Sequence, residues 1–293
     1  MFKSTTKGLR RMKLETDIQR VFGLDLFRAV AIVLVVLGHG SFILDNTFLE
    51  GFPNLRMIDG VDMFFVLSGF LIGGILLKEI NKGDKFSSYS LIQFWKRRWL
   101  RTLPNYYLIL FLNYLVIKYG IIDEDIDQFN LHFLTFTQNF NSPFYDFFWE
   151  SWSLSIEEWF YIFTPILIAV CYKVFSSKTS FLLTTLMMIT FPLLYRIYSH
   201  NPHIDAFWWD VTFRKTVLFR LDSIGYGLLA AWSFRYYHER WIKIKLPALL
   251  IGIGIIIFIL NYTSSTNTFY KQTIYFSLVP FAVMLFLPIA NNY

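Results

Sequence analysis

The sequence predicts an all-α fold, a polytopic bundle of about eight transmembrane helices. Of its 293 residues, 55% are hydrophobic and only 16% are charged, whereas a soluble domain carries about 25% charged residues. The mean hydropathy is +0.45. The apolar residues also gather in runs of about 20, the length of a helix that crosses a bilayer. These runs are too numerous for the core of one soluble domain.

Eight apolar runs are candidate spans, because a helix satisfies its own backbone hydrogen bonds within lipid. In chain order they are Leu24–Leu44, Met57–Leu77, Leu103–Tyr119, Ser153–Val174, Phe181–Ser199, Val217–Phe234, Leu246–Tyr262 and Thr273–Ala290. The stretch Phe129–Phe148 is also apolar, but Gln138, Asn139 and Pro143 interrupt it. We expect a short interfacial or re-entrant segment there.

The basic residues predict the orientation of the chain. With the N-terminus in the cytoplasm, nineteen of the 27 Lys and Arg residues fall in inner segments and six in outer ones, as the positive-inside rule requires. We therefore expect residues 1–20 to be a basic cytoplasmic tail rather than a cleavable signal peptide. Residues 21–293 are then one membrane domain. Topology explains the net charge of +6, so the bilayer is the expected partner and nucleic acid is not.

Cys171 is the only cysteine. We therefore expect neither an intramolecular disulfide nor a Cys-based metal cluster. The histidines show no metal-ligand spacing, and no metal site is predicted.

Two ionisable residues lie in the first apolar run, where each needs a partner or a wet cavity. Arg28 and His39 are 11 residues apart, so they share a helical face and stand about 16 Å apart along the axis. Asp25 lies one turn before Arg28 and can pair with it. The alternative is that Arg28 and His39 each extend to the nearer membrane surface.

A basic run at residues 96–101 precedes Pro104 and the third apolar run. Its Arg98 and Arg101 are spaced i, i+3, so they can point together at one phosphate-bearing ligand from the cytoplasm. The alternative is that the whole run only fixes the topology.

Two consecutive carboxylates, Glu157 and Glu158, lie near the start of the fourth apolar run. Ser153 or Ser155 can cap a helix here, and the first turn of a helix favours carboxylates. Capping alone explains one glutamate. Because consecutive side chains point in different directions, one of the pair is expected to face the bundle.

Two further features concern helix packing and charge within the spans. Arg220 and Asp222 lie at the start of the sixth run, and their spacing does not pair them on a helix, so we expect different neighbours for each. Gly69, Gly73 and Gly74 are expected to permit close helix packing.

Together, four segments resemble the acyltransferase-3 family of integral membrane acyltransferases. The matching segments, which occur in the order of the family, are Leu24–His39 with its Arg-x₁₀-His spacing, Gly60–Ile72, Arg98-Trp99-Leu100-Arg101 with Pro104, and Trp152–Tyr161. Arg220-Leu221-Asp222 adds weaker similarity.

The resemblance implies a membrane O-acetyltransferase in the plasma or inner membrane of a bacterium. Such an enzyme moves an acyl group, commonly acetyl, from cytoplasmic acyl-CoA to a hydroxyl of an extracytoplasmic glycan or other carbohydrate. Acyl-CoA is then a substrate, and no bound cofactor is expected. His39 is expected to act as general base or transient acyl carrier, Glu157 to orient His39 or neutralise its imidazolium, and Arg28 to bind the donor or polarise its thioester. The candidate donor- and substrate-binding residues are Arg98, Arg101, Asp25, Ser68, Arg220 and Asp222.

Two alternatives stay open at this point. The family usually continues with further helices, so the sequence is either a C-terminally truncated fragment or a shortened member. A polytopic transporter or flippase of a polar or lipid-linked substrate is the rival function, because intramembrane Arg, His and Glu also line substrate paths. Such a protein would be favoured by inverted repeats, which the sequence does not show.

Overall fold

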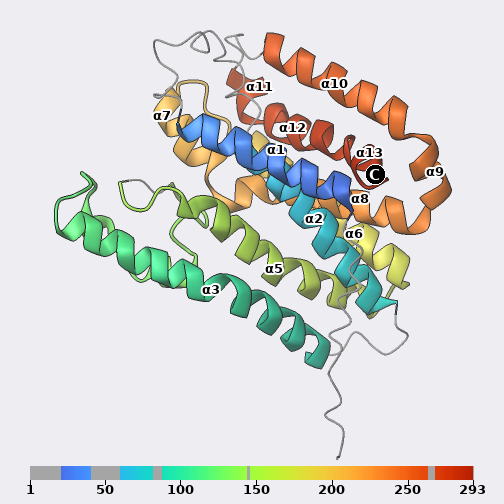
Figure 1. Cartoon of the computed structure of the whole chain (residues 1–293), viewed down its shortest axis with the longest axis horizontal. Coiled ribbons are helices and arrows are strands. Elements are labelled where there is room, and N and C mark those ends of the chain that lie inside the picture. The colour runs from blue at the N-terminus through green and yellow to red at the C-terminus, as the bar shows by residue number, and fades with distance from the viewer. Residues whose placement is uncertain (1–20, 41–59, 82–87, 144–145, 263–267, 293) are drawn as a thin grey trace, which may run out of the picture.

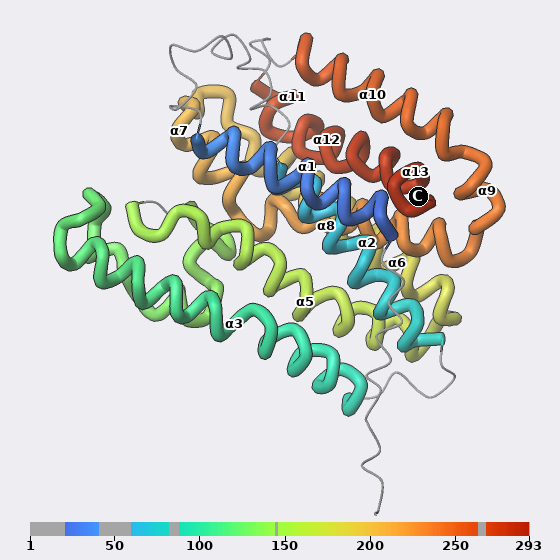
Figure 2. The backbone as a smooth tube through the Cα atoms, viewed as in Figure 1, coloured from blue at the N-terminus to red at the C-terminus, as the bar shows by residue number. Residues whose placement is uncertain are grey.

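The computed structural model describes residues 21–40, 60–81, 88–143, 146–262 and 268–292. Throughout these residues the regular structure is helical, which confirms the predicted all-α class. The principal helices are α1 (Phe22–His39), α2 (Gly60–Ile80), α3 (Ser88–Lys118), α5 (Ser151–Tyr172), α6 (Ser177–Tyr198), α8 (Val217–Tyr236), α10 (Lys245–Tyr262) and α12 (Ile274–Met284). They lie side by side along one common direction (Figure 1), and the chain reverses between successive principal helices (Figure 2).

Short helices and turns connect the principal helices. They are η3 (Ile126–Gln128), α4 (His132–Thr135), α7 (Ala206–Trp209), η4 (Asp210–Arg214), α9 (His238–Lys243), α11 (Thr268–Gln272) and α13 (Leu287–Ala290). The predicted basic tail, residues 1–20, lies outside the described residues, as do residues 41–44 and 57–59 of the first two predicted spans.

The predicted count of about eight spans is not confirmed. In the described part of the chain, five helices are long and apolar enough to cross a membrane, namely α1, α2, α5, α6 and α10. The segment Ile274–Ala290 is apolar but shorter, and it is interrupted between α12 and α13. Helix α3 carries basic side chains along with its apolar ones, and α8 carries both basic and acidic ones, which lowers the mean hydropathy of each helix.

Helix α3 begins at Ser88, well before the start of the predicted span at Leu103. The basic run at residues 96–101 therefore lies within the helix, and Pro104 is an interior helical residue. Since a helix holds its side chains at fixed angular intervals, Arg98 and Arg101 are presented on a defined face rather than from a loop.

Helices α2 and α8 pack along each other at the centre of the bundle. A Cβ atom on Gly69 would lie 2.1 Å from the carbonyl oxygen of Ile224, and one on Gly227 would lie 2.1 Å from that of Val66. Gly73 also faces α8, whereas Gly74 faces open space. Close packing is thus confirmed for Gly69 and Gly73, and the prediction for Gly74 was wrong.

Helix α1 joins the bundle through two similar glycine contacts. A Cβ atom on Gly60 of α2 would lie 2.4 Å from the carbonyl oxygen of Ala31, and one on Gly23 would lie 2.0 Å from that of Ala290 in α13. Most other α1 side chains are exposed or half-buried. The helix that carries Arg28 and His39 therefore lies on the outside of the bundle.

In its described residues, the predicted interfacial segment Phe129–Phe148 is irregular apart from one short helix, α4, and its Gln138 and Asn139 side chains are buried. Asn139 is fully buried, and its Nδ2 donates to the carbonyl oxygens of Trp152 at 3.1 Å and Lys215 at 2.6 Å. Gln138 Nε2 donates to Ser155 Oγ at 2.7 Å. These bonds pair the amide N–H groups of Asn139 and Gln138, which would be costly to leave unpaired in an apolar surrounding.

We predict that Gly69→Ala destabilises the protein by about 1–3 kcal/mol, because the added methyl group would meet helix backbone rather than a movable side chain. Thermal unfolding in detergent micelles measures the effect. Gly74→Ala is the matched control: it makes the same chemical change in the same helix, where no atom lies within 4 Å of the added group. Equal unfolding temperatures for the two variants would contradict the role of Gly69.

Candidate functional site

Helix α1 presents Arg28 and His39 to the outside of the bundle. The predicted pair is formed: Arg28 Nη1 lies 2.8 Å from Asp25 Oδ1, with side chains that are 43% and 48% exposed. At the other end of α1, His39 Nδ1 lies 2.9 Å from the carbonyl oxygen of Val35. A carbonyl oxygen can only accept, so Nδ1 carries the hydrogen and Nε2 is left as the basic nitrogen.

A second group of predicted residues meets where α2, α3 and α5 adjoin. Tyr161 of α5 donates its hydroxyl hydrogen to Glu157 Oε2 at 2.9 Å. Ser68 Oγ of α2 lies 3.3 Å from the same hydroxyl oxygen. The guanidinium carbon of Arg98 lies 5.9 Å from the centre of the Tyr161 ring. The structure thus brings Ser68, Arg98 and Glu157 together around one tyrosine.

Arg101 lies close enough to Glu157 for an electrostatic interaction, as Arg98 does. The charges of both arginines therefore act on the same carboxylate. Within the described part of the chain, neither arginine forms an ion pair with Glu157. Their charge is available to an anionic ligand.

Glu157 and Glu158 point in different directions, as expected. Glu158 is 2% exposed and faces α3, where Trp99 Nε1 donates to it at 3.1 Å and Thr102 Oγ1 donates at 2.9 Å. Glu158 thus holds α3 against α5, whereas Glu157 faces α2. Neither serine caps α5, because the helix begins at Ser151 and Ser155 is buried inside it.

The predicted contact between Glu157 and His39 is not among those formed. In the described residues, the hydrogen bond of Glu157 goes to Tyr161 and that of His39 to Val35. The two side chains belong to α5 and α1, which are separate parts of the candidate site.

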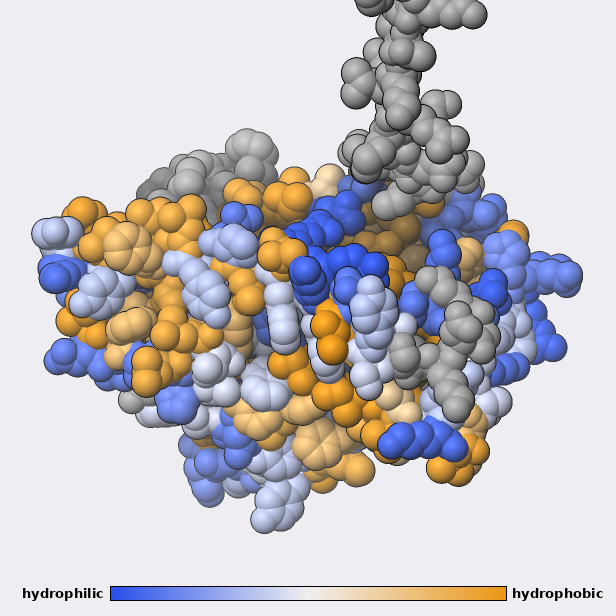
Figure 3. All heavy atoms as spheres, turned by 90° about the horizontal axis from the view of Figure 1, so that it is seen from below, coloured by the Kyte–Doolittle hydropathy of each residue, from blue (hydrophilic) through white to orange (hydrophobic). Residues whose placement is uncertain are grey.

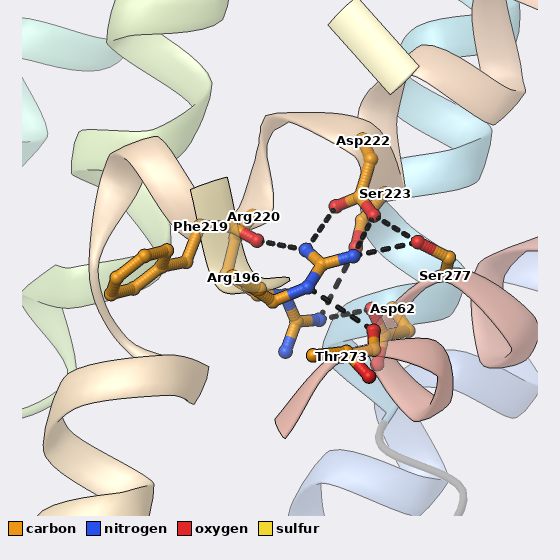
Figure 4. Close-up of polar contacts among 8 residues, drawn as sticks. All are labelled: Asp62, Arg196, Phe219, Arg220, Asp222, Ser223, Thr273 and Ser277. Carbon is orange, nitrogen blue, oxygen red and sulfur yellow. Dashed lines mark hydrogen bonds and ion pairs between the residues drawn. The ribbon is translucent and has the colours of Figure 1, made fainter. Parts of the chain in front are cut away.

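Arg220 and Asp222 lie in a buried network of charges deep in the bundle (Figure 4). As predicted, they contact different neighbours. Arg196 Nη2 lies 2.6 Å from Asp222 Oδ2, and Ser277 Oγ donates to the same oxygen at 2.7 Å. Arg220 pairs with Asp62 of α2.

All four charged side chains of this network are almost completely buried, with exposed fractions of at most 4%. Arg196 also donates to the carbonyl oxygens of Thr273 and Phe219, and the Arg220 guanidinium lies 4.5 Å from the centre of the Phe276 ring. The network therefore joins α2, α6, α8 and α12, and a substrate has no access to it in this arrangement.

Sequence reasoning missed Arg196 and the roles of Asp62 and Tyr161. The count of basic residues places Arg196 among the six outer ones, whereas the structure buries it fully inside α6. Its position within the predicted span Phe181–Ser199 was the signal that could have identified it, because an arginine inside a span requires a partner. No local signal pairs Asp62 with Arg220 or Tyr161 with Ser68.

A third cluster lies between α7 and α8, in the predicted outer connection. Asp210 is paired with Arg214 at 2.8 Å and with Lys215 at 2.7 Å. Burial opposes ionisation, but these two cations hold the pKa of the Asp210 carboxyl below its ordinary value. Lys215 also lies 4.4 Å from the centre of the Trp149 ring. The cluster fixes the connection onto the start of α5.

A shallow groove of about 420 Å³ runs along one face of α3. Its lining residues all belong to this helix: Ile92, Trp95, Lys96, Trp99, Leu100, Leu103, Pro104 and Tyr107. The space-filling view from the α3 side shows hydrophobic residues gathered toward the left and hydrophilic ones in the upper centre and at the right (Figure 3). Because the groove is almost entirely apolar, it offers a polar substrate few groups to bind.

Among the described residues, no group of three or more His, Cys, Asp or Glu side chains could hold a metal ion. The candidate site therefore consists of α1 with Arg28 and His39, and the cluster around Tyr161.

Comparisons with known proteins match this chain over most of its length. A family model described as an acyltransferase domain matches residues 21–293. The O-acetyltransferase OatA of Staphylococcus aureus (strain NCTC 8325 / PS 47) is 31% identical over 178 residues, which cover 56% of this chain and 27% of that protein. A protein of Staphylococcus aureus (strain COL), named provisionally as an O-acetyltransferase, is 30% identical over 210 residues, 67% of this chain and 32% of that protein.

The matched regions thus span less than a third of the length of these relatives. No solved structure matches the chain.

We predict that Asp222→Asn destabilises the protein by about 3–5 kcal/mol, because it leaves the buried charge of Arg196 uncompensated. Arg196→Met combined with Asp222→Leu removes both charges and is expected to be milder. Thermal unfolding in detergent micelles measures both. Asp25→Asn is the control, since its exposed pair contributes less than about 1 kcal/mol. An Asp222→Asn protein as stable as the unmodified one would refute the importance of the network.

Proposed function

The chain belongs to the acyltransferase-3 family, and we propose that it transfers an acyl group, preferably acetyl, from cytoplasmic acyl-CoA to a hydroxyl of an extracytoplasmic carbohydrate. The observation that carries the proposal is the family match over residues 21–293, which includes every helix that bears a predicted site residue. The names of the matched relatives, which are O-acetyltransferases, favour acetyl as the transferred group.

We assign His39 as the general base that acts on the acceptor hydroxyl. Its Nδ1 is engaged with the Val35 carbonyl oxygen, and this leaves Nε2 to accept a proton. A neutral imidazole has one nitrogen that accepts a proton, which suits a base that must take up and release a proton in each cycle. The exposed position of His39 leaves room for a carbohydrate to approach.

In the proposed reaction the acceptor oxygen forms a bond to the acyl carbonyl carbon as His39 Nε2 takes the hydroxyl proton. The bond between that carbon and the sulfur of CoA then breaks, and the sulfur leaves with the bonding electron pair. The proton held by His39 passes to the departing thiolate, which gives free CoA and an ester. His39 can instead carry the acyl group between the two substrates, and the same bonds form and break overall.

Arg28 is proposed to bind the donor, with Asp25 fixing its guanidinium. Arg28 and His39 lie about 16 Å apart along α1, so one thioester carbonyl cannot be in hydrogen-bond contact with both. This separation favours a role for Arg28 in binding a part of the donor nearer the cytoplasm. Polarisation of the reacting carbonyl is the less suitable of its two predicted roles.

Arg98 and Arg101 are proposed to bind the phosphate groups of the donor. Their charges act on the Glu157 carboxylate, and in the described residues neither arginine forms an ion pair with it. Guanidinium groups suit phosphate oxygens. Glu157 and Ser68 complete this part of the proposed donor site.

Arg220 and Asp222 were predicted to bind substrate, and we now propose that they act indirectly. Their burial favours a role in holding α2, α6 and α8 in place around the site.

We predict that His39→Ala abolishes transfer of a labelled acetyl group from acetyl-CoA to cell-surface carbohydrate, a loss of about 10²-fold or more. The variant should still insert into the membrane, because His39 is exposed and fills no core position. His203→Ala, another exposed histidine, is the control and should retain activity. Full activity in His39→Ala would refute the assignment. Movement of an intact solute without a covalent product would favour a transporter.

We predict that Arg98→Ala combined with Arg101→Ala raises the KM for acetyl-CoA about tenfold or more, because two charge-assisted contacts to phosphate are lost. Steady-state kinetics in membranes measure the change. Arg97→Ala removes one positive charge from the same run, and the exposed Arg97 side chain makes no contact with Glu157 or Tyr161. An equal KM in the double variant and in Arg97→Ala would rule out the phosphate role.

A further inference from the structure

We infer that Tyr161 is a positioning residue that keeps the Glu157 carboxylate apart from the guanidinium of Arg98, so that the arginine stays free to bind the donor. This inference rests on the proposed function of the Arg98 and Arg101 pair. Neither the sequence motifs nor the neighbouring charges alone predict that Tyr161 separates these two groups.

The hydroxyl of Tyr161 connects α2 to α5. Its hydrogen goes to Glu157 Oε2 at 2.9 Å. A phenol has one hydrogen, so in the second contact, at 3.3 Å, the Ser68 hydroxyl must be the donor. Glu157 and Tyr161 are one turn apart on α5, an i, i+4 spacing that brings their side chains together. The carboxylate is therefore held toward α2, away from α3.

The ring of the same tyrosine faces α3. The guanidinium carbon of Arg98 lies 5.9 Å from the ring centre, within the range of a cation–π interaction. Such a contact attracts the cation without using its N–H groups in hydrogen bonds to a carboxylate. The N–H groups of the Arg98 guanidinium therefore remain able to bind phosphate oxygens.

Tyr161 is itself held firmly in this position. It is 4% exposed, and Trp95 Nε1 donates to its backbone carbonyl oxygen at 2.8 Å. The ring of Phe94 packs edge to face with the Tyr161 ring, with 6.5 Å between the two ring centres. Trp95 and Phe94 both belong to α3. The phenol is thus fixed between the two groups whose charges attract each other.

Without the hydroxyl, Ser68 would be the one described hydrogen-bond partner left to hold Glu157 toward α2. Opposite charges in a half-buried site attract more strongly than in water, so the carboxylate is expected to turn toward Arg98 and Arg101 and pair with them. An arginine that pairs with Glu157 is lost to the donor. Tyr161→Phe is therefore expected to weaken acyl-CoA binding only while Glu157 carries its charge.

The test measures the Kd of acetyl-CoA for the full chain in detergent micelles, with radiolabelled acetyl-CoA as the probe. Tyr161→Phe, which keeps the ring, is expected to weaken binding about five- to tenfold, the scale of one competing ion pair. Adding Glu157→Gln to Tyr161→Phe removes the competing charge and should restore the affinity of the Glu157→Gln protein.

Tyr106→Phe is the matched control. Tyr106 is equally buried, at 4% exposed, and its hydroxyl donates to the Phe133 carbonyl oxygen at 2.7 Å, which is not one of the residues proposed to bind acyl-CoA. Its loss should lower the unfolding temperature as much as Tyr161→Phe does, with no change in Kd.

Unchanged affinity in Tyr161→Phe, or no recovery in the double variant, would overturn the inference and leave the proposed function standing. If the unmodified chain bound no acetyl-CoA, the donor role of Arg98 and Arg101 would fail together with the inference.

Discussion

The arrangement of this bundle depends on one constraint, that a charge placed inside an apolar helical bundle must find its opposite there. Arg196 meets this constraint through Asp222, and Arg220 through Asp62. Each pair joins helices that are distant in sequence, because the partners come from α6 and α8 in one case and from α8 and α2 in the other. Hydrophobic contact alone would let these helices slide along one another. The paired charges fix their relative heights.

The candidate site uses charge in the opposite way. At the junction of α2, α3 and α5, Arg98 and Arg101 lie near Glu157, and yet no ion pair joins them in the described residues. In the core, each cation is neutralised and enclosed. At the junction, hydrogen bonds and an aromatic ring hold the opposite charges apart, and this separation distinguishes a group that can bind a ligand from a group that only stabilises the fold.

Local sequence patterns predicted the local features of the structure. Apolar runs located the principal helices, and the i, i+3 spacing predicted the pair of Asp25 with Arg28. The same i, i+3 spacing predicted that Arg98 and Arg101 lie on one side of their helix. The exact ends of the helices were harder to predict, since α3 begins before a polar run that hydropathy alone assigns to a connection.

Contacts between distant segments could not be predicted in this way. Ser68 and Tyr161 are separated by 93 positions, and Asp62 and Arg220 by 158, so their pairing depends on how whole helices pack. Gly74 shows the same limit, because a glycine on the outer face of α2 has the same sequence signature as Gly69 on its inner face. Which face is inner was decided by α8, not by α2.

Helix α2 takes part in both groups of polar contacts. Asp62, near its start, pairs with Arg220 in the core, and Ser68, about 9 Å further along the axis, contacts Tyr161 at the candidate site. A helix is stiff over this length, so an axial shift of α2 would displace both residues by the same amount and alter both contacts. The ion pair of Asp62 with Arg220 thereby fixes the axial position of Ser68 relative to Tyr161. In this protein, the geometry of a contact at the candidate site depends on an ion pair in the core.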